Sequence, residues 1–188
     1  MNKNIIIGVV LILLSIGIFV GVKIYLDKDL DKQKENLNNT IEKYGTVEKE
    51  TIEVSIAKFN TEVMDNNIGD PAIYDYMVED NNLYWFALLD GVNLYVKSDN
   101  YTGNKDKDIT DMMVIQYSDN EKIALKYVKA LVKSNNDALT DADVDYLMKE
   151  AKTLANDKKK ANNGKGISVG FVKNEEVTEY QIIRLYKW

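Results

Sequence analysis

The chain has 188 residues, of which 45% are hydrophobic and 29% are charged, a composition that fits one folded domain with an additional segment. It contains neither cysteine nor histidine, which excludes disulfides, cysteine-based zinc sites and nucleophilic dyads that need either residue. With 24 basic and 30 acidic residues the net charge is −6, so nucleic acid is not expected as a partner.

The N-terminal segment predicts a membrane anchor over residues 1–25. From Ile5 to Val22 no residue is charged, and a helix of this length spans about 27 Å, close to the hydrocarbon thickness of a bilayer. Residues 5–25 are therefore expected to contact the lipid. The alternative is a cleaved signal peptide, which needs a shorter apolar core and a small-residue cleavage site, whereas no alanine lies near the end of this segment.

A single-pass topology in the cell membrane follows from this anchor. Lys23 and the lysines after it would hold the domain in the cytoplasm by the positive-inside rule. The short N-terminal tail and the absence of cysteine favour the opposite orientation in a bacterium, so we expect an extracytoplasmic C-terminal domain. Gly17 and Gly21 have the G-x-x-x-G spacing that lets two membrane helices approach closely, which suggests a homodimer; the alternative is that glycine is simply common in such helices.

Residues 26–47 are predicted to be a charged juxtamembrane stalk, followed by a soluble domain over residues 48–188. In the domain, Ile52, Ile56, Phe59 and Val63 have helical spacing and predict a helix over residues 48–65. Strands are predicted at 83–89 and 92–96, joined by a type I′ turn at Asp90-Gly91, and at 112–117.

The second half of the domain predicts two helices and a final hairpin. Ser118 to Glu121 has capping-box spacing and predicts the start of a helix that ends near residue 133, and Thr140 begins another that carries Leu154 near its end. The last hairpin is expected to pair residues 167–171 with 180–184. The predicted fold class is therefore α+β, with about three helices on one face of a mainly antiparallel sheet of about five strands.

Motifs that resemble catalytic or metal sites do not fit their structural context. Ser168 lies in a G-x-S-x-G pattern, yet it falls inside a predicted strand and no histidine is available as a base. Two runs of alternating aspartates, which begin at Asp27 and Asp141, lack the glycine and glutamate of a calcium loop. We therefore assign no catalytic, cofactor-binding or metal-binding residue.

Tyrosines on the predicted strands are the candidate partner-binding residues: Tyr84, Tyr95, Tyr180 and Tyr186. The alternative is that these aromatic side chains form the core. The leading hypothesis is a membrane-tethered, non-enzymatic binding or assembly module with an envelope protein as its partner. The alternative function is a surface-tethered hydrolase that acts on envelope polymers through paired carboxylates.

Overall fold

The computed structural model describes residues 45–73, 75–78 and 82–186. The predicted anchor with Gly17 and Gly21, and the stalk up to residue 44, lie outside the described residues. None of the described helices has the length and hydrophobicity that a membrane span requires.

The described chain forms an antiparallel sheet with the strand order β1-β2-β3-β4-β7-β6-β5. The strands are β1 (Asp75–Val78), β2 (Leu83–Leu89), β3 (Val92–Lys97), β4 (Met112–Tyr117), β5 (Ala161–Asn162), β6 (Ile167–Lys173) and β7 (Thr178–Arg184). Six of them have at least four residues, and β5 has two. The antiparallel α+β class is confirmed, but the sequence analysis missed β1 and β5.

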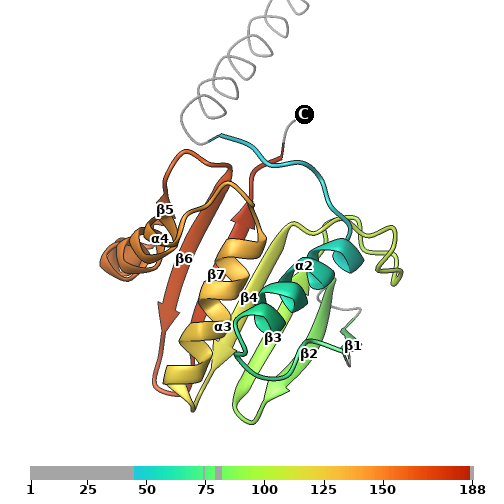
Figure 1. The fold of residues 1–188 in the computed structure, drawn as a ribbon, viewed down its shortest axis with the longest axis horizontal. Helices are drawn as coiled ribbons and strands as arrows, with labels where there is room; N and C mark the ends of the chain where they lie inside the picture. Colours follow the sequence, from blue (N-terminus) through green and yellow to red (C-terminus); the bar gives the residue numbers. More distant parts are fainter. Residues whose placement is uncertain (1–44, 74, 79–81, 187–188) are drawn as a thin grey trace, which may run out of the picture. The chain divides into compact units, whose positions relative to one another are not determined.

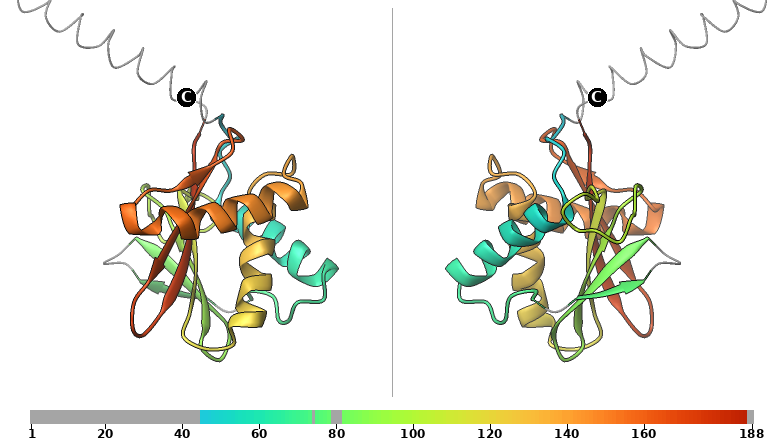
Figure 2. Two further views of the ribbon diagram at one scale, coloured as in Figure 1. Left: turned by 90° about the vertical axis from the view of Figure 1, so that its left-hand side faces the viewer. Right: turned by 90° about the vertical axis from the view of Figure 1, so that its right-hand side faces the viewer.

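Three helices cover one face of this sheet (Figure 1, Figure 2). They are α2 (Ile52–Asp65), α3 (Glu121–Ser134) and α4 (Asp141–Leu154), and a short 3₁₀ helix, η2 (Ala155–Asp157), continues α4. Helix α2 packs on α3, α3 on β4, and α4 on β6. The core lies between the helices and the sheet, and α2 contributes the four predicted residues, Ile52, Ile56, Phe59 and Val63.

Local interactions set the helix starts differently from the predictions. Helix α2 begins at Ile52 rather than at residue 48, because Thr51 caps it and the segment before it is extended, with Val47 donating a backbone hydrogen bond to Leu185 at 2.8 Å. Val47 is buried, so the compact domain includes the end of the segment assigned to the stalk. Helix α4 has the predicted capping box between Thr140 and Asp143.

The predicted capping box at the start of α3 is wrong. The helix begins at Glu121, and the preceding Asn120 is left-handed, with a φ of 57° and no side-chain cap. The Asn120 side chain instead donates a hydrogen bond to the backbone oxygen of Asp90 at 3.0 Å. This bond ties the start of α3 to the turn of the β2–β3 hairpin.

The β2–β3 hairpin lies where it was predicted, but its turn is not of type I′. A type I′ turn needs positive φ at both central residues. Gly91 has a φ of +72°, whereas Asp90 is not among the residues with positive φ. A register shift between Ala87 and Leu89 accompanies the turn. The glycine therefore supplies the left-handed conformation alone, next to a β-bulge.

Candidate binding interface

The sheet face that points away from the helices forms the candidate interface, here called the open face. Successive strand residues alternate between the two faces, so the neighbours of buried positions belong to the open face. No helix of the described residues covers it (Figure 2). One row of register partners crosses it from β2 to β6: Trp85, Tyr95, Val114, Gln181 and Gly170.

Two aromatic side chains form a platform at the β2–β3 end of this row. The rings of Trp85 and Tyr95 stack with an interplanar angle of 13° and a centroid distance of 6.4 Å. The indole nitrogen Nε1 of Trp85 donates a hydrogen bond to Asn93 Oδ1 at 2.9 Å. Both rings are half-buried, and their arrangement is fixed by mutual stacking and by this hydrogen bond.

A hydrogen-bonded ladder of polar side chains continues from Tyr95 across β4 to β7. The Tyr95 hydroxyl donates to Gln116 Oε1 at 3.3 Å, and Gln116 Nε2 donates to Glu179 Oε1 at 2.7 Å. Gln181 Nε2 donates to the other Glu179 oxygen at 3.2 Å. Burial and the negative charge of Glu179 raise the pKa of Tyr95, so its hydroxyl stays protonated and can donate.

Tyr95 of the platform and the side chains of the ladder line a shallow cavity of about 230 Å³. Leu83, Met112 and Val114 give its floor apolar character, and Lys97 and Glu179 bring opposite charges to its edge. The open face therefore combines aromatic and aliphatic contact area with polar groups that are already held in place. Such a surface can bind a partner with little additional ordering of its side chains.

The four predicted tyrosines do not lie together. Tyr84 and Tyr180 are both 0% exposed, because their strand positions point toward the helices, and neither can contribute contact area. Their assignment as partner-binding residues is corrected accordingly: they belong to the aromatic core. Tyr186 is half-buried beyond the end of β7, with the Arg184 guanidinium 5.8 Å from its ring centroid. Of the four, Tyr95 alone lies on the open face.

The sequence analysis missed Trp85 as a candidate. Leu83 to Leu89 is apolar at every position, so the alternation that normally separates a core face from a solvent face is absent from β2. Strand β3 carries the signal that identifies the open face, because Asn93 and Lys97 alternate there with apolar residues. Asn93 is the register partner of Ala87 and lies beside Trp85, so Trp85 belongs to the same face.

A buried carboxylate organises the loop between β3 and β4. Asp108 is 0% exposed and accepts hydrogen bonds from the Tyr84 hydroxyl at 2.9 Å, from the Thr102 hydroxyl at 2.6 Å and from the Gly103 backbone at 3.1 Å. Burial alone would raise the pKa of Asp108, but these hydrogen bonds outweigh it and lower the pKa. All of its partners come from the protein, so Asp108 serves to hold the loop on β2.

The structure offers no arrangement of ligands for a metal ion: within the described ranges no group of three or more carboxylates is suitably placed. Comparison of the chain with protein-family models, with curated proteins and with solved structures found no match.

Proposed function

We propose that this protein is a membrane-tethered, non-enzymatic binding module of the bacterial cell surface, and that it binds an envelope protein through the open face of its sheet. The observation that carries the proposal is the Trp85–Tyr95 platform beside the hydrogen-bonded ladder of Gln116, Glu179 and Gln181. Aromatic residues next to fixed polar groups are the usual composition of the energetic centre of a protein interface.

The dimensions of the open face favour a protein as the occupant. Pockets for small molecules usually enclose about 300–1,000 Å³ and surround the ligand. The cavity on this face is smaller, about 230 Å³, and it lies across the middle of a sheet rather than between layers. A broad surface with a shallow depression and a half-buried tryptophan suits a complementary protein surface.

The predicted anchor supplies the tether in this proposal. A helix over residues 5–25 would keep the domain near the bilayer, and the charged residues after it would separate the domain from the lipid. Protease treatment of intact cells tests the orientation. Digestion of the domain without cell lysis supports an extracytoplasmic location, whereas protection until lysis places the domain in the cytoplasm and rules out this part of the proposal.

A comparison of two tyrosine variants tests the binding face. Tyr95→Ala removes half of the aromatic platform, and Tyr146→Ala removes a tyrosine that is 50% exposed on α4. We expect Tyr95→Ala to reduce recovery of cross-linked envelope partners from intact cells at a temperature where the variant is still folded, and Tyr146→Ala to leave recovery unchanged. Equal recovery with both variants would remove the support for the open face.

One observation bears on the alternative, a carboxylate-dependent hydrolase of envelope polymers. Burial and the nearby charge of Asp99 raise the pKa of Asp111, as expected for a general acid. However, Asp111 accepts a hydrogen bond from the Asp99 backbone, and it does not line the cavity on the open face. The binding module is therefore the better-supported proposal, and activity on wall polymers that is lost in Asp111→Asn would reverse this order.

A further inference from the structure

A second cavity, of about 530 Å³, lies near the opposite edge of the sheet from the aromatic platform, where η2 and β6 meet. Its lining includes five lysines and no acidic residue: Lys152, Lys158, Lys159, Lys160 and Lys173. This lysine cavity is a local concentration of positive charge in a chain whose net charge is −6. Such a concentration attracts anions more strongly than the rest of the surface.

Among the described residues, only two of the five lysines interact with another side chain of the protein through their ammonium groups. Lys152 Nζ lies 5.8 Å from the centroid of the Phe171 ring, and Lys159 Nζ is 3.2 Å from an oxygen of Asp157. Within the described part of the chain, Lys158, Lys160 and Lys173 form neither a hydrogen bond nor an ion pair through their ammonium groups. Their charges are available to a ligand.

The backbone at Lys158 is unusual for a lysine. Lys158 has a φ of +55° at the end of η2, and the amides of Lys158 and Lys159 donate to the oxygens of Ala155 and Leu154 at 3.0 and 3.2 Å. Glycine or asparagine ordinarily takes this left-handed position after a helix. A lysine is strained in this conformation, which points to a role for its side chain other than stability.

Residues of β6, an incompletely paired strand, line one side of the lysine cavity. Strand β5 pairs only with Ser168 and Val169, so it leaves the later residues of β6 without a neighbouring strand on that side. Lysines can protect such an edge from pairing with another chain, which is the alternative explanation for Lys173. Edge protection does not explain why three consecutive lysines from the preceding turn join Lys152 and Lys173 around one hollow.

We propose that the lysine cavity binds a linear polymer that carries repeated phosphate groups. Lysine ammonium groups bind phosphate as point charges, and several of them around one hollow can contact successive phosphates of one chain. A concave site at a strand edge can admit a narrow chain, whose phosphates would lie among the lysines that line the cavity with Phe171 and Gly170. This second site adjoins the open face, with which it shares Gly170 and Gln181, but it does not depend on the protein partner proposed for that face.

The test measures binding of linear polyphosphate to the full-length protein in neutral detergent micelles. The cavity variant is Lys158→Asn, Lys159→Gln and Lys160→Gln combined. Its control, Lys122→Gln, Lys126→Gln and Lys149→Gln, removes the same charge from exposed positions on α3 and α4. We expect about a tenfold loss of affinity in the cavity variant, less than about a twofold loss in the control, and weaker binding of the wild type as salt rises.

A separate measurement addresses folding. Since asparagine tolerates the left-handed conformation better than lysine, Lys158→Asn alone should keep or raise the melting temperature while it weakens polyphosphate binding. Equal losses in the cavity and control variants, or no loss in either, would overturn the proposal. Cavity-dependent binding of anionic lipid vesicles without binding of polyphosphate would overturn it as well, in favour of a lipid headgroup.

Discussion

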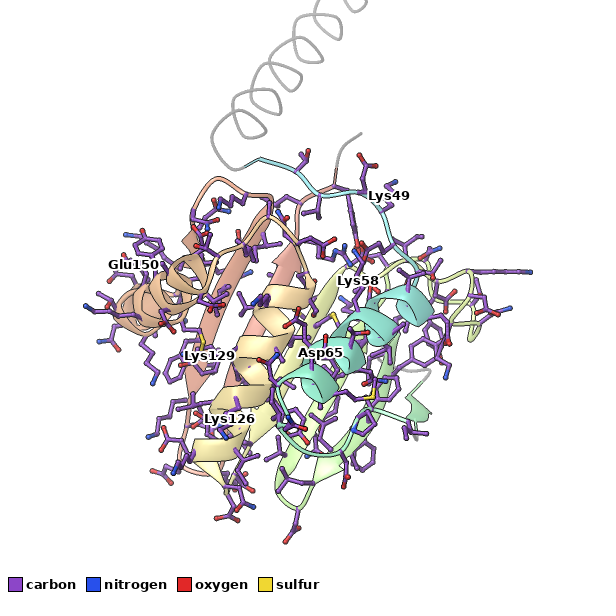
Figure 3. The ribbon with its side chains drawn as sticks, in the orientation of Figure 1. Lys49, Lys58, Asp65, Lys126, Lys129 and Glu150 are labelled. Carbon is purple, nitrogen blue, oxygen red and sulfur yellow. The ribbon has the colours of Figure 1, made fainter. Side chains whose placement is uncertain are left out.

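Arg184 on β7 and Glu50, 134 positions earlier, form an ion pair in which Arg184 Nη1 donates to Glu50 Oε2 at 2.9 Å. The same nitrogen donates to the Ser55 hydroxyl at 2.9 Å. The Arg184 side chain is 1% exposed, and the pair joins the last strand to the segment that precedes α2. Lys58, which is labelled on α2 in Figure 3, also pairs with Glu50.

We expect Glu50→Ala to lower the free energy of unfolding by about 3 kcal/mol, because it leaves a buried guanidinium without its carboxylate. The matched control is Lys58→Ala, which removes the other partner of Glu50; its side chain is 37% exposed, and the expected loss is below about 1 kcal/mol. Urea unfolding measures both. Equal losses would show that the buried pair has no special role.

Asp108 predicts a dependence of stability on pH. Its pKa in the folded protein is lower than its ordinary value, so its contribution to stability is present above about pH 4 and is lost as the pH falls below that. Asp108→Asn should lower stability at neutral pH and make the decline in acid shallower. Asp106→Asn, an exposed position in the same loop, should leave the pH profile unchanged. Parallel profiles for wild type and Asp108→Asn would contradict this explanation.

Gly91→Val should destabilise the domain by about 1 kcal/mol or more, because a β-branched residue is strained at positive φ. A Cβ atom at Gly91 would also lie 3.1 Å from Ser118 Oγ, which is tighter than an ordinary contact. Gly91→Asn is the control, since asparagine tolerates this conformation, and it should cost less. Thermal unfolding distinguishes the two, and identical melting temperatures would count against a conformational requirement for glycine.

Removal of residues 1–25 should yield a soluble, folded and acidic protein. Among the described residues, the hydrophobic core is formed by residues from Val47 onward. Size-exclusion chromatography and circular dichroism check this outcome. An aggregated or unfolded product would mean that the apolar segment belongs to the domain core and that the predicted boundary is misplaced.

Sequence patterns predicted the elements whose periodicity is strong. The spacing of Ile52, Ile56 and Phe59 identified α2, and the alternation in the last hairpin predicted its two strands but left open the register, which pairs Phe171 with Tyr180. Elements without such periodicity were missed, as with β5, which has two residues in a lysine-rich and asparagine-rich segment. The turn type at Gly91 was predicted wrongly, because an Asp-Gly pair is compatible with more than one type of turn.

The candidate sites could not be predicted from the sequence for a different reason. Tyr84 and Trp85 are adjacent and both aromatic, and only the position of the helices shows that Tyr84 enters the core while Trp85 stays on the open face. Likewise, Lys152, Lys160 and Lys173 belong to three different segments, and their approach to one cavity depends on how α4 packs on β6. Spacing in the sequence carries no information on such contacts.

The most direct test of the central proposal is photo-cross-linking in living cells, with a photoreactive amino acid in place of Tyr95 or of Tyr146. Position 95 lies on the open face and position 146 on the exposed surface of α4. The proposal predicts a discrete adduct with another envelope protein from position 95 and none from position 146. No adduct at position 95, the same adducts from both positions, or an adduct with a second copy of this chain would contradict it.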